Sequence, residues 1–533
     1  MHPYLAIVLM LLFGPASGQT VSWLLDEAVD HEFNPGLPRH ALAADQEHLV
    51  EMRAVGIDFV YGASTYGTVA IDHRDPSTGL LVNSCSLGDS VAVKAVVIGA
   101  DDVAYFAGRF LGQGMALCNG AVVGGLDGGP FTENHFLLAW DLSGGEILWA
   151  RNLSLTHPMA EDVPSIAVDP QGRLWYLLRH FTDALAVQVD AEGNDVVSRN
   201  IDGLRHLGTL SFDPWGGLYV SGSCENGTLS FGGQDFAVTS DEGYNMFVLR
   251  FRPDGTAGFA QFAEDITFQD PTVVATNDGH AYLAGSIFVE ANWGGLVAGG
   301  AIWGSNVFIA RLDSAGSFEW IVGPELSPGQ ILGDVDRAKG PCIDVDGSGS
   351  VYFLGMCRGV VEWGNDVTSG TGGVAERSLT VLAVDPMGVA QWAVNSAPTT
   401  WAVTSQGLAV AEDGASVHFL AHLADPLNMG GLSAGTIGEQ SAVTGRISLL
   451  PTGIGLEDAP SVLMSWPTPT SDVLNVEWPG AERVPAEILT TMGQVVRSTT
   501  LLPGVNRIDV SDFPSGVYLL RTSQGELGRI VVD

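Results

Sequence analysis

Residues 211–222 read Ser-Phe-Asp-Pro-Trp-Gly-Gly-Leu-Tyr-Val-Ser-Gly. They contain a short apolar run, a turn rich in Asp and Gly, and a second apolar run that ends in Gly. Two strand-like runs around such a turn are typical of a β-hairpin. Residues 274–285 and 343–355 have the same pattern, so the hairpin is part of a repeat that organises the middle of the chain.

A second hairpin follows the first in each repeat. Residues 308–320 show it best, because an apolar run, a turn with Gly316 and a run with Trp320 follow one another. The same spacing recurs at Gly145 and Trp149 and at Gly388 and Trp392. Two hairpins make a four-stranded unit, and an average spacing of roughly 60 residues fits a propeller blade with one long loop. Equivalent positions of the units fall at Gly62, Gly108, Leu178, Gly222, Gly285, Gly355 and Ala421.

Seven units predict an all-β fold in which residues 19–452 form a seven-bladed β-propeller, with six or eight blades left open. The pattern resembles the short propeller repeats of bacterial secreted proteins, which share its Asp-x-x-Gly turn and an Asn-x-Phe start to the second hairpin. That start occurs at Asn134-His135-Phe136, Asn245-Met246-Phe247 and Asn306-Val307-Phe308. The unit around Leu178 departs most from the pattern, because it lacks the Gly pair of the long loop and the Trp.

The first and last units indicate how the ring closes. The last unit provides residues 443–450 but no following strand with Trp, whereas residues 21–25 form a strand with Trp23 and no partner of their own. An open sheet edge invites aggregation, so a propeller ring needs closure. We therefore expect residues 21–25 to complete the last blade beside residues 443–450.

The two ends of the chain differ from the repeat. Residues 1–18 have the apolar core and the small-residue cleavage site of a signal peptide, and their apolar run is too short to span a bilayer. Residues 453–460 are short, polar and bounded by Pro, as a linker is. Residues 461–533 alternate strand-like runs with turn signals, which predicts a small C-terminal antiparallel β-sandwich.

This C-terminal block resembles the C-terminal sorting domain of the type IX secretion system of Bacteroidetes-type bacteria. The motif residues are Gly493, Gln494, Gly504, Asn506, Asp509, Pro514, Gly516 and Tyr518. Thr468 stands where the family usually has Asn. The resemblance implies that the type IX secretion machinery is a partner. It also implies Sec-dependent export and a protein that is secreted or held at the outer-membrane surface.

Composition limits the other partners. The formal net charge of −38 argues against nucleic acid, because nucleic-acid binding needs a basic surface. After the signal peptide, no apolar stretch is long enough to cross a membrane. The five cysteines are too few to build a disulfide-based fold, and we expect most of them to be small buried residues.

The sequence contains few signs of catalytic or metal chemistry. Asp344 and Asp346 resemble part of a calcium loop, because alternate Asp side chains can direct oxygens at one ion. Gly355 occupies the twelfth position, where such a loop needs an acid, so a blade turn is the simpler interpretation and calcium remains a candidate. No other cofactor is indicated. The chain has no Gly-x-Ser-x-Gly elbow and no phosphate-binding loop, and its His residues are scattered.

Noncatalytic binding is therefore the leading functional prediction: adhesion, or capture of a glycan or protein by the propeller face. Six Trp residues offer surfaces on which sugars can stack, although blade packing explains most of them more simply: Trp140, Trp175, Trp293, Trp303, Trp363 and Trp401. One alternative is a propeller hydrolase or lyase acting on polysaccharide or peptide, and another is a structural envelope component. A deep channel with convergent carboxylates or a His cluster would favour the enzyme.

Overall fold

The computed structural model divides into two compact units, one of residues 18–450 and one that includes residues 451–533. The described residues are 19–30, 40–61, 64–241, 243–265, 270–287, 291–293, 296–298, 306–324, 334–370, 376–399, 403–449, 464–466, 470, 472–478, 483–490, 495–522 and 527–532. The predicted signal peptide at 1–18 and linker at 453–460 lie outside them.

The first unit is built from antiparallel groups of four strands, each running from an inner to an outer strand. We call these groups blades 1–7 in chain order. Blades 1 and 2 share β6, whose first half is the outer strand of blade 1 and whose second half is the inner strand of blade 2. The strands are: for blade 1, β2 (His40–Ala44), β3 (Leu49–Ala54), β5 (Ser64–Arg74) and β6 (Leu81–Ile98); for blade 2, β6, β7 (Val103–Leu111), β10 (Glu133–Asp141) and β11 (Glu146–Asn152); for blade 3, β12 (Ile166–Val168), β13 (Leu174–Arg179), β14 (Asp183–Val189) and β15 (Asp195–Asp202); for blade 4, β16 (His206–Phe212), β17 (Leu218–Glu225), β20 (Tyr244–Phe251) and β21 (Ala257–Asp265); for blade 5, β22 (Thr272–Ala275), β23 (Ala281–Ile287), β26 (Asn306–Leu312) and β27 (Phe318–Val322); for blade 6, β28 (Asp334–Arg337) with β29 (Ile343–Val345), β30 (Val351–Arg358), β33 (Arg377–Val384) and β34 (Ala390–Asn395); for blade 7, β35 (Val403–Val410), β36 (Ser416–Leu423), β39 (Ser441–Ser448) and β1 (Thr20–Ala28).

Shorter elements lie in the loops between these strands. They are β4 (Phe59–Tyr61), which pairs with β5; the hairpins β8 (Gly114–Ala116) with β9 (Val122–Gly124), β18 (Gly227–Phe231) with β19 (Gln234–Val238), β24 (Ala291–Trp293) with β25 (Leu296–Ala298), β31 (Val361–Glu362) with β32 (Thr368–Ser369), and β37 (Leu427–Met429) with β38 (Leu432–Ala434); and the short 3₁₀ helix η1 (Leu153–Leu155).

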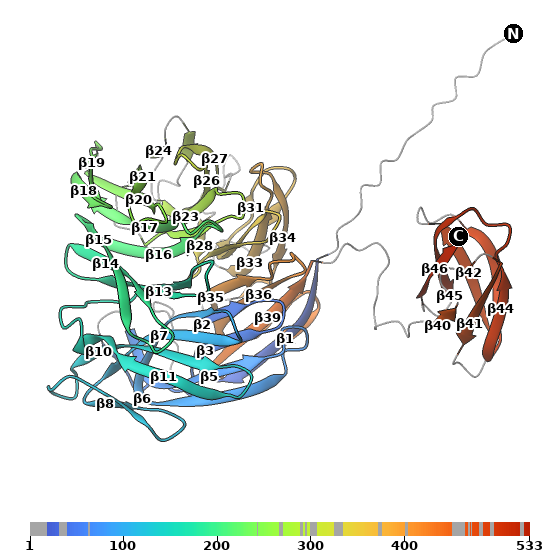
Figure 1. The fold of residues 1–533 in the computed structure, drawn as a ribbon, viewed down its shortest axis with the longest axis horizontal. Helices are drawn as coiled ribbons and strands as arrows, with labels where there is room; N and C mark the ends of the chain where they lie inside the picture. The colour runs from blue at the N-terminus through green and yellow to red at the C-terminus, as the bar shows by residue number, and fades with distance from the viewer. Residues whose placement is uncertain are drawn as a thin grey trace, which may run out of the picture. The chain divides into compact units, whose positions relative to one another are not determined.

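The inner strands form a ring. They contact one another in the cyclic order β2, β6, β12, β16, β22, β29, β35 and again β2. Figure 1 shows the blades fanning out around this ring. The fold is therefore an all-β propeller, and the described strands favour seven blades over six or eight.

The repeat pattern was wrong about the first unit. It placed the second strand at Gly62, but that strand is β3, which ends at Ala54. The apolar run Phe59–Tyr61 instead folds back on the start of β5 as β4. Gly62 itself lies outside the described residues.

The N-terminal strand β1 lies in blade 7. It pairs antiparallel with β39, with Thr20 opposite Ser448 and Ala28 opposite Ser441. Figure 1 shows the blue N-terminal strand beside the orange strands from the end of the unit. This is the place the sequence suggested for residues 21–25, and the pairing covers the edge of β39 that would otherwise be open.

The Asp of the repeated turn holds that turn together. Asp213 Oδ1 accepts hydrogen bonds from the backbone N–H of Trp215 at 3.0 Å and of Gly217 at 2.7 Å. Gly216 has φ of 87°, a conformation that favours glycine. The recurrence of Asp-x-x-Gly within the chain thus has a structural cause, because the Asp oxygen and the glycine both stabilise the turn.

In blades 2 and 5 the Trp of the repeat packs on the next blade. Trp320 in blade 5 lies on Gly388 in an outer turn of blade 6, and its Nε1 donates to the Pro386 carbonyl at 3.1 Å. A Cβ on Gly388 would lie only 2.8 Å from the indole, so the turn needs glycine. Trp149 makes the same contacts with Gly193 and the Ala191 carbonyl of blade 3. We call this contact the Trp–Gly lock.

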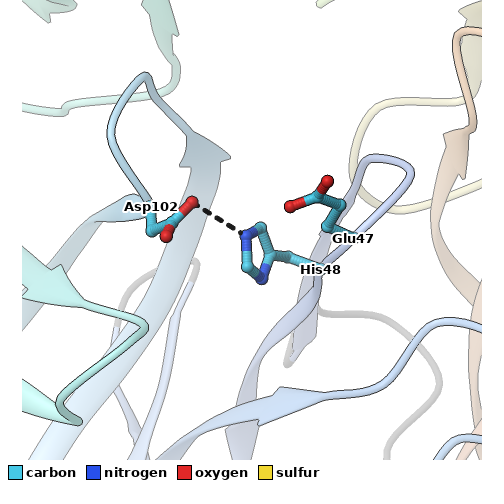
Figure 2. A group of neighbouring side chains, drawn as sticks. All are labelled: Glu47, His48 and Asp102. Atoms are coloured by element: carbon cyan, nitrogen blue, oxygen red, sulfur yellow. Dashed lines mark hydrogen bonds and ion pairs between the residues drawn. The ribbon is translucent and has the colours of Figure 1, made fainter.

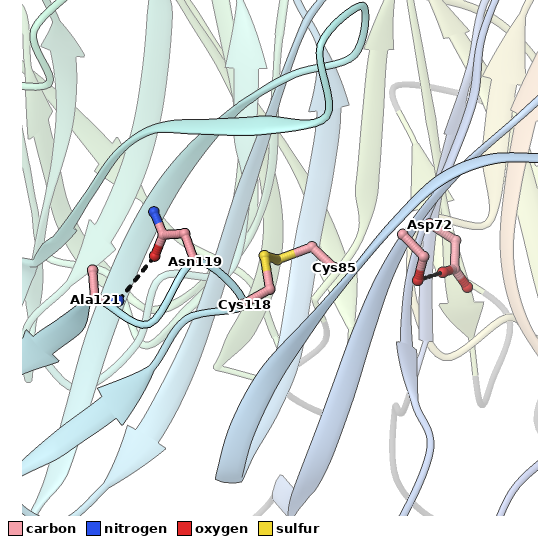
Figure 3. Close-up of a disulfide and its surroundings, with 6 residues drawn as sticks. Asp72, Cys85, Cys118, Asn119 and Ala121 are labelled. Atoms are coloured by element: carbon pink, nitrogen blue, oxygen red, sulfur yellow. Dashed lines mark hydrogen bonds between the residues drawn. A yellow bond between two sulfur atoms is a disulfide. The ribbon is translucent and has the colours of Figure 1, made fainter.

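A disulfide ties blade 1 to a loop of blade 2. Cys85 in β6 is bonded to Cys118, which follows the β8 strand (Figure 3). The other cysteines, Cys224, Cys342 and Cys357, are buried and form no disulfide. The expectation of small buried residues holds for these three, and the disulfide is consistent with an exported protein.

The C-terminal unit contains two antiparallel sheets. One has the order β40 (Met464–Trp466), β41 (Val473–Trp478) and β44 (Gly504–Asp509); the other has the order β43 (Val495–Leu501), β42 (Val484–Thr490), β45 (Gly516–Thr522) and β46 (Leu527–Val532). Side chains of both sheets share one apolar core, including Val476 and Ile508 from the first and Ile488 and Leu520 from the second. Burial of this core is the main source of stability for so small a unit.

Candidate functional site

The centre of the propeller is a narrow aliphatic channel. A cavity of about 300 Å³ is lined by residues from all seven inner strands. Most of them are Ala, Val, Leu and Ile, with a few Ser and Thr. Its two carboxylates, Asp45 and Asp344, accept hydrogen bonds from backbone N–H groups. Among the described residues, both acids of the channel lining thus already accept backbone hydrogen bonds.

The calcium candidates Asp344 and Asp346 have their oxygens occupied by protein donors. Asp344 accepts from the backbone N–H of Val345 and Val410, and burial raises its pKa to about 6. Asp346 accepts from the backbone N–H of Ser348 and from the Tyr352 hydroxyl. Within the described residues, no third metal-ligating side chain joins these two. Calcium at this turn stays a prediction.

A larger groove lies between blades 3 and 4. Its volume is about 910 Å³. The outer strand β15 forms one wall, and the β18–β19 hairpin extends the same sheet beyond it. Gly232 at the tip of that hairpin packs so closely on blade 4 that a Cβ would lie 2.3 Å from Ala257 N. The Gly pair of this loop therefore lets the hairpin dock on blade 4 and close one end of the groove.

The groove lies where blade 3 lacks the Trp–Gly lock. Val197 pairs with Gln188 on the neighbouring strand, as Trp320 pairs with Arg311 in blade 5, so Val197 occupies the Trp position. Its side chain is much smaller and is 43% exposed. Arg199 lies instead over Gly255 of blade 4, and its Nη2 donates to the Pro253 carbonyl at 3.0 Å.

Arg199 forms the floor of the groove. Its guanidinium lies 4.8 Å from the ring centre of Trp175 and 5.5 Å from that of Phe251. Burial lowers the pKa of Arg199, and its Nη1 is buried without a hydrogen-bond partner in the described structure. An unmatched donor on a cavity floor can bind a ligand oxygen without first losing a protein partner. The walls are polar and include Gln188, Ser198, Asn200, Asp202, Gln234 and Asp235.

The Trp residues that the sequence offered as sugar-stacking surfaces are structural where they are described. Trp140, Trp175, Trp293 and Trp363 are at most 4% exposed. Trp303 and Trp401 lie outside the described residues. Blade packing, the simpler interpretation, accounts for the four that can be examined.

One cluster of ionisable groups was missed by sequence reasoning. Glu47 and His48 follow inner strand β2, and Asp102 lies in the corresponding turn of blade 2 (Figure 2). His48 Nε2 lies 3.2 Å from Asp102 Oδ1, and His48 Nδ1 lies 3.0 Å from His73 Nε2. Burial, followed by the proximity of His48, lowers the pKa of His73. Aligning the sequences of equivalent turns in neighbouring units would have shown that Glu47, His48 and Asp102 occupy equivalent turns.

The described sorting-motif residues lie in or next to strands β44 and β45 of the C-terminal unit. Gly504 has φ of 89°, and Asn506 Nδ2 donates to the carbonyl of Leu502 at 2.7 Å. Asp509 accepts from the backbone N–H of Ser511, and a hydrogen bond from the Ser511 hydroxyl lowers its pKa. The hydroxyl of the buried Tyr518 donates a hydrogen bond to the Pro514 carbonyl at 2.7 Å. Gly516, between these two residues, is the first residue of β45. Gly493 and Gln494 lie outside the described residues. A direct role of these residues in recognition stays a prediction.

Comparison with protein families agrees with the sequence resemblance at the C-terminus. Residues 464–532 match the family described as secretion system C-terminal sorting domain. The chain therefore ends in a type IX sorting domain, which implies interaction with that secretion machinery. It also implies export, with a final location at the cell surface or outside the cell.

No curated protein matches the sequence. Among solved structures, the chain is similar to PorZ of Porphyromonas gingivalis, described as an essential bacterial surface component of the type-IX secretion system. The two share 12% identity over 93% of this chain and 81% of that one, with a TM-score of 0.25. A PL25 ulvan lyase shares 11% identity over 79% of this chain and 97% of its own, with a TM-score of 0.40. The fold described here rests on the strand pairing of this chain.

A prolyl endopeptidase is a third similar structure, with 11% identity over 83% of this chain, 55% of its own chain and a TM-score of 0.39. Among the described residues of this protein, no helix has the length and apolar character needed to cross a membrane.

Proposed function

We propose that this exported protein is a noncatalytic binding protein whose groove between blades 3 and 4 captures a largely neutral glycan. The groove itself carries the proposal, because it opens where Val197 replaces the Trp of the repeat. Loss of a blade-to-blade contact costs stability, and a polar groove of about 910 Å³ takes its place. That volume lies within the range of small-ligand sites.

The lining suits a ligand rich in hydroxyl groups. Amide side chains such as Gln188 and Asn200 both donate and accept, Asp202 and Asp235 accept, and Arg199 donates. A sugar hydroxyl also donates and accepts, so a chain of sugars can satisfy such a mixed surface. The aromatic rings beneath the floor are covered by Arg199, so recognition rests on hydrogen bonds more than on ring stacking.

Charge selects against polyanions. The groove lining contains the cations Arg173 and Arg199 and the acids Asp202, Asp235 and Asp254. The whole chain has a net charge of −38, and its field repels sulfated or uronic-acid chains at low salt. A neutral glycan avoids this repulsion, and Arg199 can still bind one of its oxygens.

The aliphatic channel also favours binding over hydrolysis or lysis. The sequence-based criterion for an enzyme was a deep channel with convergent carboxylates or a His cluster. Both carboxylates that line this channel bind backbone N–H groups, and the described residues of its lining include no His. Adhesion is the biological role that fits an exported glycan-binding protein. A structural envelope role would need no groove of this composition.

The test uses the substitution Val197→Trp, which restores the lock and fills the groove. Wild-type protein is applied to an array of neutral and acidic glycans, and the affinity for the best neutral ligand is measured by calorimetry. We expect Val197→Trp to weaken binding by at least tenfold without lowering the melting temperature. Phe259→Trp is the matched control, because Phe259 occupies the same position in blade 4 and already lies on Gly316.

Two results would overturn the proposal. One is a glycan array on which no neutral glycan binds. The same holds if only acidic glycans bind on the array, or if only proteins bind in a parallel screen. The other is glycan binding that Val197→Trp leaves unchanged, which would move the binding surface away from the groove.

A further inference from the structure

The cluster at the turns of blades 1 and 2 is an arrangement of metal ligands that the proposed glycan groove does not use. Glu47, His48 and Asp102 each offer one ligand atom, and these atoms all lie within 4.8 Å of one another. Figure 2 shows the two carboxylates on either side of the imidazole. Among the described residues, this is the one such group of three or more His, Cys, Asp or Glu side chains.

We propose that Glu47, His48 and Asp102 bind a divalent transition-metal ion, of which Zn²⁺ is the best match. An imidazole with two carboxylates is a donor set that Zn²⁺ accepts, whereas Ca²⁺ takes oxygen ligands. Neighbouring ligands on tetrahedral Zn²⁺ lie roughly 3.4 Å apart, given bonds of about 2.0–2.2 Å. The present spread of 4.8 Å has to shorten by about 1.4 Å, and the exposed Glu47 and Asp102 side chains are free to turn inward.

The turns place the ligands with little freedom in the backbone. Asp45 Oδ1 accepts from the backbone N–H of Glu47 at 2.8 Å and of His48 at 2.7 Å, which fixes the first turn. Asp102 has φ of 56° and forms the second turn with Asp101, whose φ is 58°. Pre-positioned ligands lose less conformational entropy when the ion binds.

His73 contacts the ring nitrogen of His48 that does not face the ion. Their ring nitrogens lie 3.0 Å apart, and His73 is 5% exposed. When Nε2 of the neutral His48 ring binds the metal, the single ring proton is on Nδ1. Nδ1–H then donates a hydrogen bond to His73 Nε2. A ligating His usually donates its second ring N–H to such a partner, and the partner orients the ring. His73 then carries its own proton on Nδ1, so both rings stay neutral.

His280 also has two carboxylates near its ring, but their arrangement does not suit a metal ion. His280 Nδ1 lies 3.0 Å from Asp278 and His280 Nε2 lies 3.6 Å from Glu319. The carboxylates lie against opposite ring nitrogens, so they cannot share one ion with the same nitrogen. His280 has the same composition of neighbours as His48 but lacks their convergence, which makes it a matched control.

The site would also leave coordination positions open. Three protein ligands fill three of the four positions that Zn²⁺ prefers. The turn before Glu47 includes Asp45, which also lines the channel, so the open position lies near one mouth of that channel. A water molecule or an oxygen of a bound molecule would complete the coordination there.

Calorimetric titration of the full chain, prepared without a His tag and stripped with chelator, tests the proposal with ZnCl₂. We expect one ion per chain in the wild type, no saturable binding in His48→Ala, and at least tenfold weaker binding in His73→Ala. His280→Ala should bind as the wild type does. Melting curves without metal establish that each variant is folded, and anomalous scattering at the zinc edge from soaked crystals gives the ion's position.

Three outcomes would overturn the site. The wild type fails to bind Zn²⁺ with a defined stoichiometry, His48→Ala retains wild-type affinity, or His280→Ala loses as much affinity as His48→Ala. If His48→Ala does not fold, the anomalous peak decides alone: an ion elsewhere, or no ion, excludes this cluster.

Discussion

The interface that closes the ring, between blades 7 and 1, differs from the interface between blades 5 and 6. Inside the ring, blades 5 and 6 meet through apolar side chains and two repeated contacts, the Trp320 lock and the hydrogen bond from the Tyr282 hydroxyl to the Gly349 carbonyl. The closing interface also has a lock, because Trp23 lies on Gly79 and its Nε1 donates to the Ser77 carbonyl at 3.0 Å. It adds buried charges and His residues to that lock.

The charged groups and Thr444 join four strands. Arg74 in β5 contacts Glu51 in β3 at 3.3 Å and Glu27 in β1 at 2.8 Å, and Thr444 in β39 donates to Glu51. Glu51 has no exposed surface. His40 of blade 1 and His422 of blade 7 also meet, at 3.0 Å between ring nitrogens. Blades inside the ring are neighbours because the chain connects them, whereas the two ends must find each other. Buried polar groups that pair only with each other would make the contact between blades 7 and 1 specific.

The largest expected effect comes from removing residues 19–28. The deletion takes away β1 and its eight register pairs with β39, which at about 1 kcal/mol each puts the loss on the order of 8 kcal/mol. Thermal unfolding followed by circular dichroism measures it. Adding a synthetic peptide of residues 19–28 should restore part of the melting temperature by mass action, and a scrambled peptide should not. An unchanged melting temperature in the deletion would show that β1 does not close the ring.

Next in size is the loss of a buried cation. Burial raises the pKa of Glu51, and Arg74 opposes this shift. The substitution Arg74→Met leaves Glu51 buried without its main partner and should cost about 3–5 kcal/mol. The double variant Glu51→Gln with Arg74→Met removes both charges and should recover much of that loss. If the double variant is as unstable as Arg74→Met alone, then packing and not charge makes Arg74 necessary.

Acid should weaken the closing interface through His418. Its Nε2 donates to the Pro76 carbonyl of blade 1 at 3.0 Å, and burial lowers its pKa to about 4. The folded state therefore favours neutral His418, while the unfolded state takes up a proton near pH 6.5. Stability from this group is present above pH 6.5 and is lost as the pH falls toward 4, by about 3 kcal/mol in total.

Comparison of wild type with His418→Gln isolates this effect, because the other titrating groups are common to both. The stability difference should shift in favour of the variant by about 3 kcal/mol between pH 7 and pH 4. His135, at the interface of blades 2 and 3, also has its pKa lowered to about 4 by burial and serves as the interior counterpart. A difference that does not change with pH would mean that His418 titrates normally in the folded protein.

The sequence predicted those features of the blades and their interfaces that recur along the chain. Asp-x-x-Gly turns and the Gly-to-Trp spacing recur because several blades use the same turn and the same lock, so a single sequence shows them as a pattern. The surplus strand around Trp23 and the missing one after residue 450 located the closure for the same reason. The pattern failed at Gly62, where a local hairpin of Phe59–Tyr61 imitates a blade strand.

The candidate sites escaped prediction because they depend on departures from the repeat and on contacts between units. Val197 was noticed only as a missing Trp, and the groove that its small side chain opens requires blades 3 and 4 to be placed together. His48 and Asp102 are separated by 54 residues and meet only when the turns of two blades lie side by side. The pairing of Cys85 with Cys118 also depends on loop placement, which spacing alone does not define.

The smallest expected effects compare the two locks directly. Trp23→Phe and Trp320→Phe each keep an aromatic ring on the glycine and remove the indole N–H. Loss of one hydrogen bond should cost about 1 kcal/mol at Trp23. The cost should be smaller at Trp320, because the Pro386 carbonyl also accepts from Arg311 Nη1 at 2.8 Å and keeps that partner. Denaturant unfolding of both variants measures the two values. In the peptide-rescue assay, the same Trp23 substitution in the added strand should weaken restoration by about fivefold, since about 1 kcal/mol corresponds to that factor. A larger loss at Trp320 than at Trp23 would mean that the closing interface relies on its buried charges and not on the lock it shares with the rest of the ring.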